Sequence, residues 1–229
     1  MTDITVADAA ARLGLSPARV RALIAAGDLP ARKLGGRWVL DPVDIDAADA
    51  KVRVSGRPWS PRMAWGLIGL AEGRKPIDLS APERSRLRSR LRGQPELGAL
   101  ARLTRKRSET HRLHLHRGAL GRALGWPGGA PTGTSARGHE LVKADTVELY
   151  LPANSLGQLI RDLHAKPAFG AEVNLTVHVP AVEHWPFLTD AGTVTVAFDL
   201  WDAGDDRSRR TAASLFERAL ASYHDGVAV

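Results

Sequence analysis

The sequence predicts an α+β protein in which a small N-terminal domain precedes a basic helical segment and a C-terminal mixed α/β domain. Three observations lead to this prediction. Residues 1–50 combine two short helical patterns with a β-hairpin pattern, residues 62–126 are rich in arginine and helix formers, and residues 127–229 alternate strand and helix patterns. Residues 51–61 combine Gly, Pro and Ser with three cations, which is typical of an exposed linker.

The N-terminal residues contain two helical patterns separated by a short turn. Thr5, with Asp8 three residues later, occupies the position of a capping box before an apolar stripe that ends at Gly14. Ser16 is a favoured N-cap for the second helix, which Gly27 ends. Two short helices joined by a tight turn that contains glycine form a helix-turn-helix, whose second helix can enter the major groove of DNA.

A β-hairpin pattern follows the second helix. Leu29–Leu34 and Arg37–Leu40 predict two strands around Gly35-Gly36, and glycine tolerates the positive φ angles of a tight hairpin turn. Asp41 then predicts the start of a third helix. Together these elements predict a winged helix-turn-helix domain. The candidate DNA-binding residues are the cap serine and the cations of the second helix and hairpin: Ser16, Arg19, Arg21, Arg32, Lys33 and Arg37.

These residues resemble a known family. Residues 4–47, ITVADAAARLGLSPARVRALIAAGDLPARKLGGRWVLDPVDIDA, are similar to the helix-turn-helix domain shared by phage excisionases and MerR-type regulators. The match runs without a gap through helix, turn, helix and wing, including the basic strand ARKLGGRW and the closing DPVDI. The resemblance implies that the second helix enters the major groove and that the wing lies along the adjacent backbone or minor groove.

The sequence departs from the family pattern on the second helix. Ala18 and Ala22 stand where members often have a larger polar or aromatic residue. We therefore expect base readout to depend on Arg19, Arg21 and the shape of the DNA. The alternative is a family fold that is used only for contact with proteins.

Charge is distributed unevenly along the chain. Residues 1–50 hold six Lys and Arg against seven Asp and Glu, residues 51–126 hold eighteen against five, and residues 127–229 hold eight against thirteen. The middle range therefore carries a net charge of +13 and the C-terminal range one of −5. This partition predicts a polyanionic partner for the basic part, and partner binding or dimerisation for the acidic part.

One helix pattern in the middle range is dominated by arginine. The segment RSRLRSRLRG follows Ser80 and Glu83, which form a second capping-box pattern. Helical spacing gathers arginines on one side and leaves a narrow apolar stripe. The helix is either a solvated surface or a second phosphate-contacting surface. The candidate phosphate contacts are Arg84, Arg88, Arg92, Arg105, Lys106 and Arg107.

Other chemical motifs are weak. The chain has no cysteine, which excludes disulfides, thiolate metal sites and cysteine nucleophiles. His114 and His116 would share one face of a strand, but the sequence associates no third ligand with them, so we expect no metal and no cofactor. The stretch GGAPTGTS, residues 128–135, carries Thr134 where a phosphate-binding loop has lysine, and we interpret it as a flexible loop.

The C-terminal part predicts a small mixed sheet covered by helices. Residues 146–152, 172–180 and 193–201 have strand patterns, and residues 154–165 and 207–223 have helix patterns. The resulting order of elements is β-α-β-β-α.

A second, shorter resemblance lies near the C-terminus. Residues 196–220, VAFDLWDAGDDRSRRTAASLFERAL, are similar to the C-terminal part of AbiEi-like antitoxins, through the pattern DL.D.GD.RSRR and the order of domains. The resemblance implies an autorepressor of a toxin-antitoxin operon, encoded beside a nucleotidyltransferase toxin that is its partner. It also implies that the chain has no catalytic residues.

These observations together predict a sequence-specific DNA-binding protein, an antitoxin-type transcriptional autorepressor that binds promoter DNA and can form a homodimer. We expect it in the cytoplasm, because no signal peptide or membrane-spanning apolar run is apparent. Two alternatives stay open. The protein is an excisionase-like architectural DNA-binding factor, or it is a nucleic-acid enzyme targeted by its helix-turn-helix, which would use Asp199 and Asp202.

Overall fold

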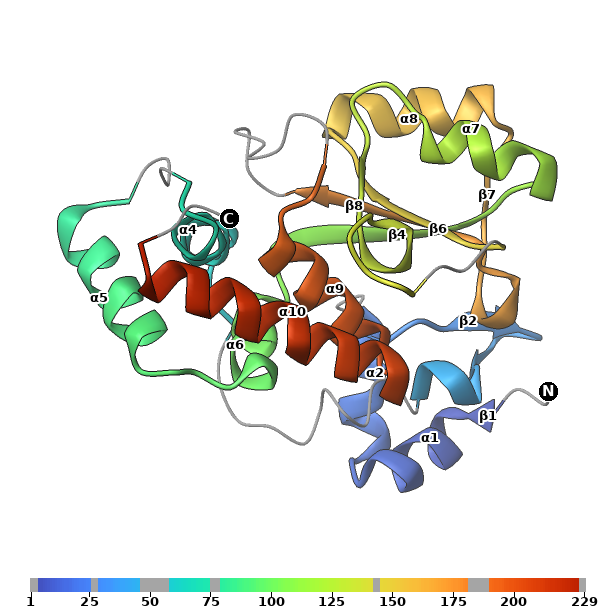
Figure 1. Cartoon of the computed structure of the whole chain (residues 1–229). Helices are drawn as coiled ribbons and strands as arrows, with labels where there is room; N and C mark the ends of the chain where they lie inside the picture. Colours follow the sequence, from blue (N-terminus) through green and yellow to red (C-terminus); the bar gives the residue numbers. More distant parts are fainter. Residues whose placement is uncertain are drawn as a thin grey trace.

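The computed structural model describes residues 4–25, 29–45, 58–74, 79–141, 145–180 and 190–226. These residues form two parts, which we call the HTH (described residues up to 45) and the body (described residues from 58 on), as Figure 1 shows. The HTH contains a three-stranded sheet with strand order β1-β3-β2, and the body contains a five-stranded sheet with order β5-β6-β8-β4-β7. The predicted α+β class is confirmed.

The HTH is built from two helices and a small antiparallel sheet. Its elements are β1 (Ile4–Thr5), α1 (Val6–Leu13), α2 (Pro17–Ala25), β2 (Arg32–Leu34), β3 (Arg37–Leu40) and a helical stretch at 42–45. Strand β3 pairs with both β1 and β2. The core of this part contains Val6, Ala9, Ala10, Leu13, Val20, Leu23, Leu29, Leu40 and Ile45.

The predicted helix signals of the HTH are confirmed in the structure. The hydroxyl of Thr5 accepts a hydrogen bond from the N–H of Asp8 (3.3 Å), and the Asp8 carboxylate accepts one from the N–H of Thr5 (3.2 Å), which completes the capping box. Gly14 ends α1 with a φ of 63°, in the left-handed region that favours glycine. Ser16 Oγ accepts a hydrogen bond from the N–H of Arg19 (3.2 Å) at the start of α2.

The body combines helices with the larger sheet. Its helices are α4 (Pro61–Ala71), α5 (Ala81–Arg92), α6 (Leu97–Thr104), α7 (Leu120–Leu124), α8 (Ala153–Asp162), α9 (Thr193–Ala203) and α10 (Asp206–His224), with 3-10 turns η1 (Arg117–Ala119), η2 (Gly133–Ser135) and η3 (Gly170–Glu172). Its strands are β4 (Ser108–His114), β5 (Ala130–Pro131), β6 (Val147–Tyr150), β7 (Lys166–Pro167) and β8 (Leu175–Pro180). Among the described helices, none has the length and apolar character needed to cross a membrane.

Helices cover both faces of the body sheet. Helices α7 and α8 lie over one face, around a core that includes Leu149, Leu159 and Val177. The opposite face carries Tyr150 and meets a second core, to which α4, α5, α6, α9 and α10 contribute. Within the sheet, β6 and β8 run parallel, and the pairs β4–β8, β4–β7 and β5–β6 run antiparallel.

The prediction of a strand at residues 193–201 is wrong, because these residues belong to helix α9. Val194–Leu200 are all buried, because this part of α9 packs against α10, α4 and α6. A segment that is buried on all sides has no diagnostic hydrophobic period, and the β-branched residues of this segment favour a strand only when it is considered in isolation. Gly204, with a φ of 87°, ends α9 and directs the chain into α10.

The ranges 62–126 and 127–229 share one structure. Strand β4, from the first range, pairs with β8 and β7 from the second. Leu67 and Leu100 of the first range and Phe198 and Phe216 of the second lie in the same core. The packing therefore does not divide the body at residue 126.

Residues 128–135 do not form the flexible loop that we expected. Thr132 and Thr134 are buried, and Ala130–Pro131 forms strand β5 against β6. The N–H of Glu148 donates to Ser135 Oγ (2.9 Å), which ties this segment to β6. Polar side chains that we expected to face solvent instead hold this segment against the sheet.

Candidate nucleic-acid interface

Helix α2 buries one side and exposes the other. Val20 is fully buried in the HTH core, whereas Arg19 and Arg21 are exposed. Because successive helical residues are rotated by about 100°, these two arginines lie on opposite flanks of α2. Ser16 is also exposed at the N-terminal end of the helix. The three predicted residues of the second helix are therefore accessible to a ligand.

Small side chains form the outermost face of α2. Ala18 and Ala22 are each two residues from Val20, which places them nearly opposite the buried side, and both are exposed. A face of alanines lets the helix backbone approach a groove closely, while an arginine on each flank can reach a phosphate or a base edge. The departure from the family pattern thus produces a smooth face between two cations.

The wing is the hairpin of β2 and β3. Gly35 and Gly36 have φ angles of 56° and 78°, as a type I′ turn requires at both central positions. The prediction of a hairpin turn at this dipeptide is confirmed. The first strand is shorter than predicted and begins at Arg32, because Leu29 is buried in the core and Pro30 has no N–H to donate to a strand pair.

The three wing cations are exposed but have different neighbours. The ammonium of Lys33 lies 5.1 Å from the ring centre of Trp38, its partner on the opposite strand. The guanidinium of Arg32 lies 5.6 Å from the ring centre of Phe169, which belongs to the body. Arg37 follows the turn directly, at the tip of the wing. Lys33 and Arg37 therefore project from the HTH alone, whereas Arg32 also contacts the body.

The acidic side chains described in the HTH are engaged elsewhere. Asp8 completes the capping box of α1, Asp41 accepts a hydrogen bond from the N–H of Val43 (2.9 Å), and Asp44 pairs with Arg112 of the body. No acidic side chain among the described residues forms an ion pair with Arg19, Arg21, Lys33 or Arg37. The positive charge of this surface is therefore available to a phosphate backbone.

Helix α5 forms a second basic surface. A hollow of about 430 Å³ is lined by Ala81, Arg84, Ser85, Arg88, Ser89 and Arg92. The acidic residue of this helix, Glu83, pairs with Arg62 (Nη1 to Oε2, 3.0 Å) and caps the helix with Ser80. The hydrogen bonds from Arg62 and Ser80 lower the pKa of Glu83 to about 2, so it stays ionised and bound to these partners. It does not neutralise the arginines of the hollow.

The predicted cluster of Arg105, Lys106 and Arg107 is not a single surface. Lys106 is exposed and Arg105 is half-buried, but only 2% of the surface of Arg107 is accessible. The prediction of a phosphate contact at Arg107 is wrong, because its side chain is directed into the protein. The structure thus removes one cation from the predicted set.

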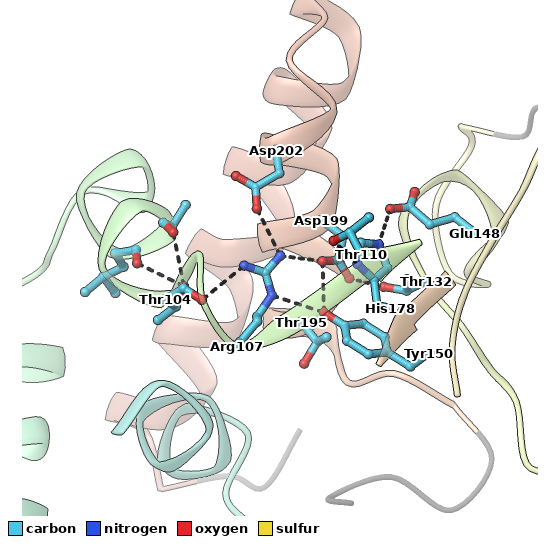
Figure 2. A network of polar contacts seen from close by, with 12 residues as sticks. Thr104, Arg107, Thr110, Thr132, Glu148, Tyr150, His178, Thr195, Asp199 and Asp202 are labelled. Atoms are coloured by element: carbon cyan, nitrogen blue, oxygen red, sulfur yellow. Dashed lines mark hydrogen bonds and ion pairs between the residues drawn. The ribbon is translucent and has the colours of Figure 1, made fainter. Parts of the chain in front are cut away.

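Arg107 lies at the centre of a buried polar network, shown in Figure 2. Its Nε donates to Tyr150 Oη (3.0 Å), and its Nη2 forms ion pairs with Asp199 and with Asp202 (3.1 Å). The hydroxyl of Tyr150 donates to Asp199 Oδ1 (3.0 Å), and the hydroxyl of Thr132 donates to Asp199 Oδ2. Burial alone would lower the pKa of Arg107, but Tyr150 and the two carboxylates hold it well above its usual value.

This network assigns a structural role to the carboxylates that were candidates for catalysis. Asp199 and Asp202 are three residues apart on α9, so both side chains reach Arg107 from one side of the helix. The sequence did not indicate the network, because its members come from distant segments and no local spacing connects Thr132, Tyr150 and Asp199. Within the cluster of Arg105, Lys106 and Arg107, the sequence alone does not show which side chain is buried.

The network continues through His178 on β8, the central strand of the sheet. Its Nε2 is 2.8 Å from Glu148 Oε1, and its Nδ1 is 3.2 Å from the hydroxyl of Thr110. Burial would lower the pKa of His178, but the hydrogen bond with Glu148 and the nearby negative charges raise it above its usual value. Glu148 therefore favours the protonated form of His178.

The two histidines that were weighed as metal ligands have separate partners. His114 Nδ1 is 2.8 Å from the carbonyl oxygen of Glu172, and His116 Nδ1 accepts from the N–H of Gly118 (3.2 Å). Strand β4 ends at His114, so the two side chains are not on one strand. In the described part of the chain, no group of three or more potential metal ligands is present.

Comparison with known proteins agrees with the geometry of the HTH. Residues 4–48 match the family model of a helix-turn-helix domain. The chain therefore carries a DNA-binding helix-turn-helix domain, and the resemblance expected from the sequence is confirmed for this segment. Searches of curated proteins and of solved structures found no match.

Proposed function

We propose, starting from the helix-turn-helix domain at residues 4–48, that this protein is a sequence-specific DNA-binding repressor of its own promoter. The observation that carries the proposal is the accessibility of one set of side chains. Ser16, Arg19, Arg21, Lys33 and Arg37 are exposed on α2 and the wing. The cations among them have no acidic partner in the described part of the chain.

In this proposal α2 occupies the major groove and the wing lies on the neighbouring backbone or minor groove. The alanine face of α2 lies against the base edges, and Arg19 and Arg21 reach the two sides of the groove. Lys33 and Arg37 supply contacts to phosphate, or to a narrow minor groove. Sequence selection then depends on few base contacts and on the deformability of the site.

Helix α5 adds a sequence-independent contact to phosphate. Arg84, Arg88 and Arg92 lie beside the serine hydroxyls of the same hollow, and this combination suits phosphate oxygens. Arg90, by contrast, lies over the ring of Trp59, 6.0 Å from its centre. Arg105 and Lys106 belong to the same proposed set as peripheral contacts.

The antitoxin role rests on the motif at residues 196–220, and the structure explains why that motif has this pattern. Asp199 and Asp202 bind Arg107, and Gly204 provides the left-handed turn between α9 and α10. Asp205 then caps α10 by accepting from the N–H of Ser208 (2.8 Å). The motif residues therefore have structural roles within the body, and this use of Asp199 and Asp202 supports a non-enzymatic role. We propose a nucleotidyltransferase toxin as the partner, and a cytoplasmic location.

A gel-shift titration with the chain's own promoter tests the repressor, and a reporter driven by that promoter tests repression. Tight binding with loss of reporter signal supports the proposal, and equal affinity for promoter and random duplex contradicts it. Co-purification with a toxin encoded next to the gene tests the antitoxin role. An integrase gene in that position would instead favour an excisionase-like factor.

A further inference from the structure

The HTH and the body are joined by an ion pair between their surfaces. Asp44, in the helical stretch 42–45, places its Oδ1 3.2 Å from Nη1 of Arg112 in strand β4. The side chains of Asp44 and Arg112 are 12% and 34% exposed, so the pair is partly shielded from water. Such a pair is screened less than one on the open surface.

Two further contacts lie beside this ion pair. The guanidinium of Arg32 is over the ring of Phe169, and Asp41 lies against the backbone of Gly170 at the start of η3. A Cβ atom at Gly170 would be 2.0 Å from Oδ2 of Asp41, so the close approach requires glycine, which also has a φ of 58° here. Figure 1 shows β2 below β7 and the turn that follows it.

The docked surface of the HTH is distinct from its candidate DNA-binding surface. Asp41, Asp44 and Arg32 face the body, whereas the exposed residues of α2 and the tip of the wing remain open. Docking therefore involves one of the six residues predicted to bind DNA, Arg32, whose side chain stays exposed. Arg32 has an aromatic partner in the body, and its position is explained without a duplex.

We infer that Arg112 and Phe169 are positioning residues for DNA binding, and that Arg32 is a docking residue. This inference rests on the proposed DNA-binding function. The docking contact holds the HTH in one orientation, so that a duplex on α2 meets the body at a fixed geometry. Phosphate contacts from the body then form within one complex rather than in a separate encounter, which raises the overall affinity.

Charge reversal separates this inference from a simple effect of net charge. Asp44→Arg adds positive charge, so electrostatics alone predicts tighter DNA binding, whereas loss of docking predicts weaker binding. We expect Asp44→Arg and Arg112→Asp each to weaken binding to the promoter duplex by about 5-fold, a modest coupling between two sites. The double variant restores the pair with inverted charges, and should return to within about 2-fold of the wild type.

Arg117→Asp is the matched control for Arg112→Asp, because it makes the same charge change at an exposed position of η1. Tighter binding by Asp44→Arg, or a double variant as weak as the worse single variant, would overturn the inference. If Asp44→Arg does not fold, the promoter affinity of the double variant is compared with that of Arg112→Asp alone.

Cross-linking tests docking directly and without DNA. The chain has no cysteine, so Asp44→Cys with Arg112→Cys offers a unique pair for a short bis-maleimide reagent. We expect efficient intramolecular cross-linking, and a cross-linked protein that keeps its affinity for DNA. Absence of cross-linking, or loss of binding on cross-linking, would contradict the inference. Equal affinity of the wild type for promoter and random duplex would contradict the proposed function, and this result is separate from the results for docking.

Discussion

Burial decides the role of each arginine at the scale of single residues. Arg88 on α5 is exposed and is available to a polyanion. Arg107 is buried and is held by two carboxylates and a phenol, so it serves the core. A buried cation is tolerated only with such partners, because desolvation costs several kcal/mol when charges are unpaired.

Replacing Arg107 with methionine should destabilise the protein strongly. The change leaves Asp199 buried without its cation, and breaking a buried pair in this way costs about 3–5 kcal/mol. Lys106→Met is the matched control, because Lys106 is exposed, and should change the free energy of unfolding by less than about 0.5 kcal/mol. Urea unfolding measures both; a small effect for Arg107→Met would show that the network is not a stabilising unit.

His178 predicts a pH dependence of stability. Its pKa is raised in the folded state, so its contribution to stability is fully present below its unfolded pKa of about 6.5 and is lost as pH rises through the folded value. Burial also raises the pKa of Glu72. Ionisation of this buried carboxyl as pH rises therefore also lowers the free energy of unfolding. We expect a lower free energy of unfolding at about pH 8.5 than at about pH 6.

The variant Glu148→Gln identifies the source of this dependence. It removes the carboxylate whose hydrogen bond raises the pKa of His178, so the difference in stability between the two pH values should shrink. Unfolding curves of both proteins at both pH values provide the measurement. An unchanged difference would assign the pH dependence to other groups.

At the scale of elements, the sequence predicted those helices and turns whose ends carry strong local signals. The capping box at Thr5 and Asp8, the left-handed Gly14 and the Gly35-Gly36 turn are properties of a few adjacent residues, and they predicted α1, α2 and the wing. Helix α9 was not predictable in this way. Its conformation is decided by helices that surround it, and its β-branched residues suggested a strand.

The proposed role of α5 predicts a change in salt dependence. Replacing Arg84, Arg88 and Arg92 together by Gln keeps good helix propensity and removes three cations from the hollow. The slope of log affinity against log salt should become shallower by about 2–3 units, and affinity for promoter and random duplex should fall alike. A control triple, with Gln at the exposed positions of Arg117, Arg122 and Arg161, should keep the wild-type slope.

Three outcomes distinguish the interpretations of α5. A slope that changes only in the first triple variant supports contact with phosphate. Equal slopes in all three proteins would make α5 a solvated surface. A loss confined to the promoter would mean that the helix reads bases or mediates association between chains.

At the scale of the whole molecule, the folding units are the HTH, which has its own core and small sheet, and the body, whose single sheet has a core on each face. The HTH has its own core, which the periodicity of residues 4–45 indicated. The body was divided at residue 126 in the sequence-based prediction because charge changes sign there, but charge describes the surface and not the pairing of strands. Strand β4, from the basic range, lies between β8 and β7, and no local pattern could reveal that neighbourhood.

Fragments test this division of the molecule. Residues 58–229 keep the whole sheet and both cores of the body, and should fold cooperatively. Residues 127–229 lack β4 and helices α4 to α7, and should not fold alone, because the remaining apolar surface would be exposed. Near-UV circular dichroism and urea unfolding of both fragments provide the comparison. Cooperative unfolding of the shorter fragment would contradict the shared core.

Affinity for the promoter duplex measures directly whether α2 and the wing bind DNA. The variants Arg21→Ala and Arg37→Ala each remove one exposed cation from this surface, and Arg12→Ala removes an exposed cation from α1 as the control. Each of the first two changes should cost about 1–3 kcal/mol of binding free energy where the side chain reaches a base edge, and less where it reaches phosphate. The control should bind almost as the wild type does. Promoter affinity unchanged in both Arg21→Ala and Arg37→Ala would show that α2 and the wing are not the DNA-binding surface.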